Sequence, residues 1–392
     1  MQGPRLAPPR KPTGTTPLLV IRVASVVILL FIFLLGVKGL GDGFEMLGKD
    51  VVERFFRATE NPFVGLIIGI LATTLVQSSS VTTSMIVGLV AAPDNPLPLA
   101  NAIPMIMGAN IGTTVTNTLV SIAHIGRKQE FQRAFAAATC HDFFNYFAVL
   151  LLLPLELMTG ILGRSADALT DLFLSWGTGG VHYESPLKGA LSAGWKPLKS
   201  AVYAISSSTG VQAALILLIA ATLIFFALTM LVKTMRTMLQ SRVEMGLMGA
   251  LGEKGVVAIM VGIVATVMVQ SSSITTSLLI PLAGAGVITI HQVFPITIGA
   301  NLGTTITALL ASLAATGVNA PAGITIALVH LLFNLTATII VYPIPKIRRL
   351  PISAAQKLAA IAVRSRSLAI GYVAFLFYLL PALVATIDWM FF

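Results

Sequence analysis

Long apolar runs alternate with short charged segments along most of the chain. Roughly 20 consecutive apolar residues cross a bilayer as an α-helix, and runs of this length recur throughout the sequence. The pattern therefore predicts an all-α polytopic membrane protein. The uninterrupted spans are predicted at 18–40, 101–123, 134–155, 211–232, 293–315, 323–343 and 368–389.

Two further apolar runs, 62–92 and 255–286, carry a polar break near the centre. The first contains Gln77 followed by three serines, and the second contains Gln270 followed by three serines. Lipid cannot satisfy the backbone groups that a broken helix exposes, so protein, water or an ion must pair with them. Each run is therefore predicted to be a re-entrant hairpin or a discontinuous helix.

The two broken runs belong to a longer internal repeat. GANIGTTVT at 108–116 returns as GANLGTTIT at 299–307, and a histidine-led segment that ends in proline also occurs twice. Three motifs in the same order, at nearly constant spacing, predict one repeat at 62–155 and another at 255–343. Internal repeats with broken helices at matching places are typical of secondary transporters, which bind substrate where the repeats meet.

Charges in the connecting segments orient the spans. Basic residues outnumber acidic ones by three to one in 124–133, by four to two in 233–254 and by six to none in 346–366. Acidic residues outnumber basic ones by five to three in 41–61, and the two balance in 155–210. The positive-inside rule places the basic segments in the cytoplasm. With both broken runs folded back, the N-terminus is cytoplasmic, the hairpins enter from opposite sides, and the repeats are inverted.

The rest of the chain flanks or connects the repeats. The first apolar run is predicted to be a retained helix and not a signal peptide, because it is long and lacks a cleavage site of small residues. The predicted parts are a cytoplasmic tail at 1–17, the first span with a polar connector at 18–61, an extracytoplasmic loop with a linking span and a cytoplasmic loop at 156–254, and a basic cytoplasmic segment with the last span at 344–392.

Composition narrows the possible functions. The chain is 56% hydrophobic and only 10% charged, with a formal net charge of +10. Its basic residues lie between apolar spans, where they orient a membrane protein, so nucleic-acid binding is not expected. The single cysteine, Cys140, allows neither an intramolecular disulfide nor a cysteine-rich metal site.

The serine segments are candidate anion sites. Each half-helix that begins after a break would present free N–H groups and the positive end of its dipole, and the hydroxyls and amides add neutral donors. Two such ends facing one another would hold an oxyanion. The alternative is that the small serines only allow close helix packing. The candidate residues are Gln77, Ser78, Ser79, Ser80, Gln270, Ser271, Ser272 and Ser273.

The two GANxGTT motifs are candidate cation sites. Asn110 and Thr113 lie on one helical face, as do Asn301, Thr304 and Thr307. Hydroxyl, amide and carbonyl oxygens are hard ligands that suit sodium. The alternative is a packing seam of small polar residues.

Asp142 is the only acidic residue deep inside a clear span. A carboxylate within the membrane is costly, so it is a functional candidate by default. Asn145 follows one helical turn later on the same face. The second repeat keeps the asparagine, as Asn334, but has Leu331 in place of the acid. We therefore expect one sodium site that belongs to the first repeat alone. The alternative is a protonated carboxyl that is hydrogen-bonded to a neighbouring helix.

Together these segments resemble the type II sodium/phosphate cotransporter family. The resemblance rests on both Q-S-S-S segments and on IPMIMGANIGTTVTNT, FQRAFAAATCHDFFN, IALVHLLFN and YPIPKIRRLPI, and it covers most of the chain after the first span. It implies sodium-driven uptake of inorganic phosphate at the Q-S-S-S segments. It also implies sodium ligation around Asn145, Asn301, Thr304 and Thr307. In that family an aspartate at the place of Asp142 accompanies electrogenic transport.

The chain departs from the animal members of that family at several places. His124 and Arg127 stand where those members tend to have glutamine and aspartate, and Ala300 replaces a serine that some of them carry. The first two departures argue against a cation site at the turn around His124, and the third removes a serine hydroxyl. Segment 155–210 is short and free of cysteine, which fits a bacterial protein in the inner membrane.

The sequence thus predicts a secondary transporter, not an enzyme, that binds sodium and then imports phosphate, as the divalent anion, by electrogenic alternating access. Its partners would be phosphate, sodium and the lipid bilayer, with a homodimer left open. Three alternatives are a sodium-coupled transporter of a carboxylate or sulfate, a phosphate exporter, and a passive channel. A membrane-embedded serine hydrolase is a fourth, which the absence of a G-x-S-x-G motif at either serine segment disfavours.

Overall fold

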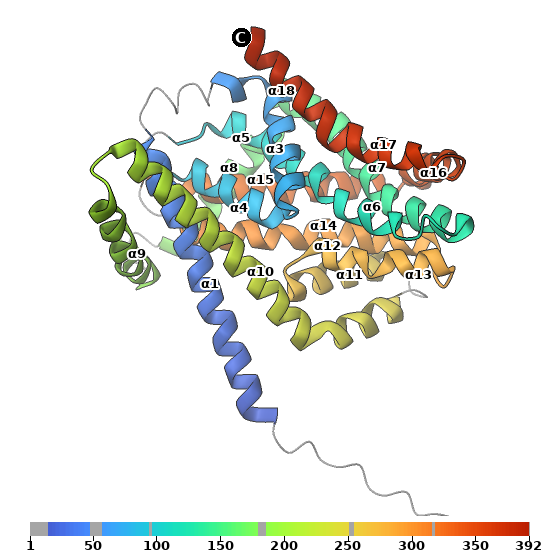
Figure 1. Cartoon of the computed structure of the whole chain (residues 1–392), viewed down its shortest axis with the longest axis horizontal. Helices are drawn as coiled ribbons and strands as arrows, with labels where there is room; N and C mark the ends of the chain where they lie inside the picture. The colour runs from blue at the N-terminus through green and yellow to red at the C-terminus, as the bar shows by residue number, and fades with distance from the viewer. Residues whose placement is uncertain are drawn as a thin grey trace, which may run out of the picture.

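The computed structural model describes residues 15–47, 57–93, 96–178, 186–250, 255–315 and 318–391. All regular elements in these ranges are helices (Figure 1). Most of the predicted cytoplasmic tail, residues 1–14, lies outside the described part of the chain. The all-α prediction is confirmed for the residues that are described.

Six helical segments in the described ranges are long and apolar enough to cross a membrane, which confirms a multi-pass membrane protein. Five of them lie within single helices, and the sixth runs through a last span that changes from α-helix to π-helix and back. They belong to α1 (Thr15–Met46), α7 (Lys128–Thr159), α10 (Thr209–Ala250), α14 (Ile290–Ser312), α15 (Ala320–Val341), and the series α17 (Arg366–Ala374), η1 (Phe375–Leu379) and α18 (Leu380–Phe391).

The span expected at 101–123 is divided into α5 (Leu99–Thr113) and α6 (Val115–Ile122). The joint is Thr114, which keeps right-handed helical angles, with φ −77° and ψ −19°. Its N–H donates to the carbonyl oxygen of Ile111 only three residues back, at 3.2 Å, so the helix tightens for one turn. The equivalent stretch of the second repeat continues without interruption in α14.

Segments expected to be loops form helices instead. Within 156–210 lie α8 (Ile161–Thr178) and α9 (Pro186–Ile205), and α16 (Pro345–Ala362) follows α15. Gly160 takes a left-handed conformation, φ 62°, that ends α7, and the Glu156 carboxylate accepts hydrogen bonds from the first backbone N–H groups of α8. Charged residues on one face of an amphipathic helix resemble a loop when only composition is considered.

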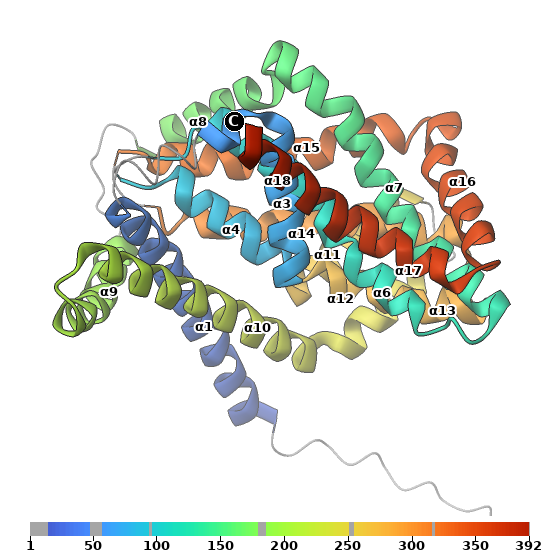
Figure 2. The same cartoon turned by 45° about the horizontal axis from the view of Figure 1, so that its top comes forward.

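Each serine segment lies between short helices. The first joins α3 (Pro62–Val76) to α4 (Ser79–Val90), and the second joins α11 (Gly255–Val269) to α12 (Ser272–Ser277), which α13 (Leu279–Ala285) follows. The last span lies across the first of these units, with α18 packed on α3 (Figure 2).

Helix contacts occur in matched pairs. Helix α3 packs on α5 as α11 packs on α14, and α16 packs on α7 as α8 packs on α15. Glycines let α3 approach α5 closely, and α11 approach α14. A Cβ at Gly108 would overlap the Leu66 carbonyl oxygen, and a Cβ at Gly299 would overlap the Ile259 carbonyl oxygen. These contacts place the two serine segments against the two GANxGTT motifs.

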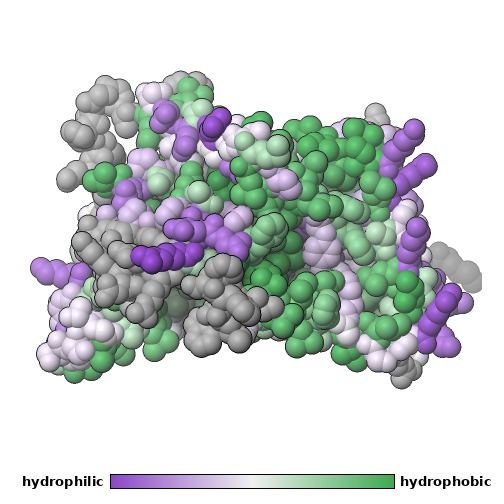
Figure 3. Space-filling model, turned by 90° about the horizontal axis from the view of Figure 1, so that it is seen from above, coloured by the Kyte–Doolittle hydropathy of each residue, from purple (hydrophilic) through white to green (hydrophobic). Residues whose placement is uncertain are grey.

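Helices α1 and α10 form a long pair that crosses at the side of the molecule (Figure 1). Seen from above, apolar side chains cover the middle of the surface, and hydrophilic ones gather toward its left part and along its right edge (Figure 3). Exposed apolar side chains such as Leu150, Ile339 and Leu379 would contact lipid in a membrane protein.

Candidate functional site

The two serine segments break their helices with the same backbone conformation. Gln77 has φ 58° and Gln270 has φ 57°, and these are the only non-glycine residues with positive φ in the described part of the chain. A left-handed conformation is unfavourable for a residue that has a Cβ, so the surroundings must hold it. Both glutamines lie where sequence reasoning placed a functional break.

The first serine of each segment caps the helix that follows. Ser78 and Ser271 are extended, and their hydroxyl oxygens accept hydrogen bonds from the N–H groups of Val81, at 3.4 Å, and Ile274, at 3.3 Å. Such a bond satisfies one of the backbone donors that the first helical turn leaves unpaired. The serine pattern therefore also has a local structural role, which the sequence prediction did not include.

Each glutamine joins its segment to the neighbouring span. Gln77 Oε1 accepts a hydrogen bond from the Thr116 hydroxyl at 3.1 Å, and Gln270 Oε1 accepts one from the Thr307 hydroxyl at 3.2 Å. The second bond links a predicted phosphate residue to a predicted sodium ligand. Among the described residues no hydrogen bond joins the two serine segments directly.

The two segments differ in exposure, but each is followed by a helix of similar length. Ser79, Ser80 and Ser272 are buried, whereas Gln77 is exposed. Helix α4 has 12 residues, and α12 continues into α13 through Leu278, which keeps helical angles and donates to the Ile274 carbonyl oxygen at 3.3 Å. Each serine segment is therefore followed by a helix of similar length, so the prediction that two helix N-termini supply backbone donors to an anion stays open.

Four predicted cation ligands form a buried asparagine cluster. Asn301 Nδ2 donates to Asn145 Oδ1 at 2.7 Å, and Asn145 Nδ2 donates to the backbone oxygen of Asn110, also at 2.7 Å. Asn334 Nδ2 donates to Asn110 Oδ1 at 3.1 Å. Helices α5, α7, α14 and α15 thus bring residues of both repeats together, and their amide and carbonyl oxygens are of the type that binds sodium.

The threonines of the two motifs are oriented differently from the asparagines. The hydroxyls of Thr113 and Thr304 each donate to a backbone oxygen of their own helix four residues back, at 2.9 Å and 3.0 Å. Both side chains are buried. Their oxygens keep lone pairs that could accept a cation, but no hydrogen bond of the described residues joins them to the asparagine cluster.

Asp142 lies in a separate polar environment. Its side chain is fully buried, and its carboxylate accepts hydrogen bonds from the Tyr372 hydroxyl at 2.8 Å and from the Thr118 hydroxyl at 3.3 Å and 3.5 Å. No Lys or Arg of the described ranges forms an ion pair with it. A carboxylate surrounded by hydroxyl groups, without a basic partner, is chemically suited to hold sodium.

Sequence reasoning missed three residues of this region: Asn117, Thr118 and Tyr372. The first two directly follow the repeated segment GANIGTTVT at 108–116, and the second repeat has Ala308 and Leu309 in their places. Comparing the repeats for lost polar residues could have found them, as it found Asp142. No repeat pattern covers Tyr372, because the last span lies outside both repeats.

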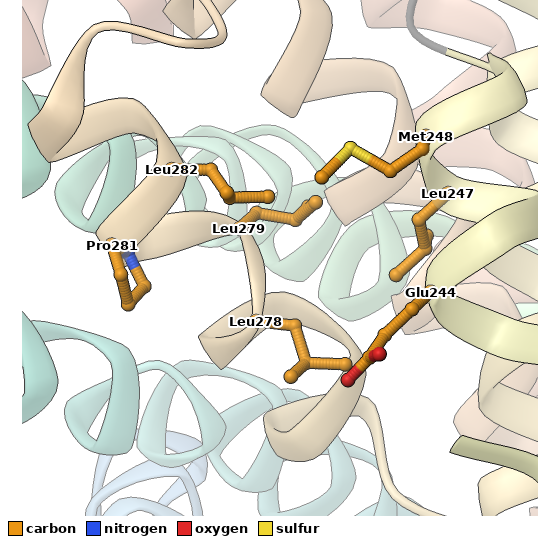
Figure 4. Close-up of a pocket in the computed structure, with 7 residues that line it drawn as sticks. All are labelled: Glu244, Leu247, Met248, Leu278, Leu279, Pro281 and Leu282. Carbon is orange, nitrogen blue, oxygen red and sulfur yellow. The ribbon is translucent and has the colours of Figure 1, made fainter. Parts of the chain in front are cut away.

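An apolar pocket of about 200 Å³ lies apart from these residues, between α10 and the end of the second broken unit (Figure 4). Leu247 and Met248 of α10 face Leu279 and Leu282, and Glu244 supplies the carboxylate at its rim. None of the predicted substrate or sodium residues lines this pocket. Its apolar walls are unsuited to a small hydrated anion.

The chain matches the model of one protein family, described as Na+/Pi-cotransporter, over residues 32–163 and 223–341. Both serine segments, both GANxGTT motifs and Asp142 lie in the matched ranges. The last span, with Tyr372, lies outside them.

Individual relatives are similar over nearly the whole chain. Sodium-dependent phosphate transport protein 2A of Rattus norvegicus is 34% identical over 451 residues, which cover 98% of this chain and 70% of that protein. Sodium-dependent phosphate transport protein 2B of Homo sapiens is 32% identical over 440 residues, which cover 91% of this chain and 63% of that protein. These matches are to transporters and not to enzymes. No solved structure matches the chain.

Proposed function

Because this chain belongs to the Na+/Pi-cotransporter family, we propose that it imports inorganic phosphate by coupling its movement to sodium. The observation that carries the proposal is the pair of left-handed glutamines, Gln77 and Gln270, each followed by a serine that caps the next helix. Two matching polar breaks within apolar helices are the arrangement from which secondary transporters build substrate sites.

In this proposal phosphate binds between the two Q-S-S-S segments. The serine hydroxyls and glutamine amides supply neutral donors, which hold an oxyanion and also release it. The bonds from Thr116 to Gln77 and from Thr307 to Gln270 orient the glutamine side chains. With no arginine or lysine bonded to either segment in the described chain, co-bound sodium would supply the positive charge.

Sodium binds in two places in this proposal. One is the asparagine cluster with the nearby threonines: Asn145, Asn301, Thr304 and Thr307, with Asn110, Thr113 and Asn334 as weaker candidates. The other is Asp142 with the Thr118 hydroxyl. A sodium ion held by the carboxylate would add one positive charge to the ions that cross the membrane with phosphate. Transport is therefore proposed to be electrogenic.

Alternating access would follow from two inverted repeats that rock against each other around the asparagine cluster. The matched contacts of α3 with α5 and of α11 with α14 support this part of the proposal. In this proposal the protein lies in a bacterial inner membrane with its N-terminus in the cytoplasm, an orientation that the basic connecting segments support.

The test is uptake of radiolabelled phosphate into proteoliposomes that contain the purified protein. A sodium gradient is expected to drive accumulation, and a choline gradient is not. Uptake that does not respond to sodium would refute the coupling. Excess unlabelled sulfate or carboxylate should compete far less than phosphate, and the reverse order would assign another anion as substrate.

A further inference from the structure

Asn117 of α6 forms buried hydrogen bonds with the helix that carries the second serine segment. Its Oδ1 accepts from the Ser277 hydroxyl at 3.1 Å and lies 2.9 Å from the Thr276 hydroxyl, whose single proton it shares with the backbone oxygen of Ser272 at 2.8 Å. The Asn117 side chain is 1% exposed. These bonds hold the C-terminal end of α12, whose N-terminal end follows Ser271. Thr276 and Ser277 lie within two turns of Ser271 on one continuous helix, since α12 runs into α13 through Leu278, so these bonds and the serine segment move together.

The other side of Asn117 faces a chain of polar groups that leads to the asparagine cluster. Asn301 donates through Nδ2 to Asn145, so its Oδ1 accepts from His141 Nε2 at 2.7 Å. This tautomer leaves His141 Nδ1 as the acceptor for Asn117 Nδ2, at 3.4 Å. A continuous path of hydrogen bonds therefore runs from the second serine segment to Asn145.

The first repeat's serine segment has no such connection. The residues that match Thr276 and Ser277 are Thr83 and Ser84, and the hydroxyls of both donate to the backbone oxygen of Ser80 in their own helix. The residue that matches Asn117 is Ala308, which is buried in α14, a helix that packs on α4. A methyl group cannot accept a hydrogen bond, so the polar path exists on one side only.

His330 gives an independent sign of the same asymmetry. It matches His141, yet its Nδ1 is buried without a hydrogen-bond partner. In the first repeat the corresponding nitrogen faces Asn117. The histidine nitrogen is thus paired in the repeat that has Asn117 and unpaired in the repeat that has Ala308 at the matching position.

We propose that Asn117 is a positioning residue that holds the serines of the second segment in register and links them to the proposed sodium ligands through His141 and Asn301. This inference rests on the proposed function. Sodium binding at the asparagine cluster would order His141, and through Asn117 it would order α12 before phosphate arrives. The second segment would then be the sodium-dependent half of the phosphate site.

The first test is Asn117→Ala, because alanine is the residue that the second repeat has at the matching position, Ala308. The half-saturating phosphate concentration is expected to rise roughly tenfold, with the maximal rate within about twofold of the parent protein, because the hydrogen bonds orient binding groups without contacting phosphate. The half-saturating sodium concentration should rise in parallel. Thr222→Ala, which removes an exposed hydroxyl bonded only to its own helix on α10, is the control and should change neither value.

A second variant removes the partners and leaves Asn117 in place. Thr276→Val with Ser277→Ala should reproduce the higher phosphate requirement, and the combination with Asn117→Ala should add little, because all three changes remove the same bonds. Additive effects, or an unchanged phosphate requirement in either folded variant, would overturn the inference. If Asn117→Ala does not fold, the phosphate requirement of the Thr276→Val, Ser277→Ala double variant decides whether the inference holds. If the parent protein shows no sodium-driven phosphate uptake, the proposed function fails instead.

Discussion

Tyr372 of α17 donates a hydrogen bond to the carboxylate of Asp142 on α7, with 2.8 Å between the hydroxyl oxygen and Oδ2. The two residues are 230 positions apart in the chain. Helix α17 belongs to the last span, which lies outside the region matched by the family model. A residue beyond the two repeats therefore helps to solvate the buried carboxylate of Asp142, which has Leu331 at the matching place in the second repeat.

Tyr372→Phe is expected to destabilise the protein most when sodium is absent. The empty carboxylate loses a donor, and a hydrogen bond to a charged group contributes about 1.5–3 kcal/mol. Bound sodium would replace part of this stabilisation, so sodium should raise the thermal unfolding midpoint more in the variant than in the parent. Midpoints measured across a sodium titration, with choline holding ionic strength constant, check this. Tyr203→Phe on α9, where the hydroxyl is exposed, is the control. If sodium raised the unfolding midpoint equally in parent and variant, Tyr372 would not contribute to the sodium site.

Asp142→Gly is expected to transport phosphate without moving net charge and to need less sodium. Removing the carboxylate removes the charge partner of one sodium ion, while the asparagine cluster is left intact. Asp142→Asn, which leaves no cavity, should behave in the same way. The measurement is current per phosphate transported, with Asp167→Asn on the exposed face of α8 as the control. A current per phosphate equal to that of the parent would show that Asp142 carries no coupling ion.

The breaks at Gln77 and Gln270 could be predicted because a run of polar residues is costly inside an apolar span unless the helix opens there around a polar site. For Asn301 and Asn145 the sequence indicates only that the two residues lie close together, because each belongs to a motif that recurs in both repeats. It does not indicate the hydrogen bond between them. The partner of Asp142 could not be anticipated, since no local pattern relates α7 to α17. The helices α8, α9 and α16 were missed because their charged faces resemble loops, and they become helical by packing an apolar face on neighbouring spans.

Ser78→Ala and Ser271→Ala are expected to raise the half-saturating phosphate concentration in a protein that still inserts and folds. Each substitution also removes a helix cap, which costs about 1 kcal/mol of local stability. The glycine variants separate the two roles, because glycine caps a helix nearly as well as serine but has no hydroxyl. If the hydroxyl binds phosphate, alanine and glycine should weaken binding equally. Normal phosphate binding in the glycine variants alone would assign these serines to capping.

Gly108→Ala and Gly299→Ala are expected to reduce the yield of folded protein more than any polar substitution above. A Cβ at either position would overlap a backbone carbonyl oxygen of the neighbouring helix, and backbone cannot move aside as a flexible side chain can. Forcing α3 from α5, or α11 from α14, would cost about 1–3 kcal/mol or more and would displace the serine segment that each pair supports.

Gly249→Ala on α10 is the matched control, since no atom lies within 4 Å of its added methyl group and alanine favours a helix by about 0.5–1 kcal/mol. Monodisperse yield in detergent and the unfolding midpoint measure the difference. Yields for Gly108→Ala and Gly299→Ala that match Gly249→Ala would mean that these helix pairs can separate without loss of the fold.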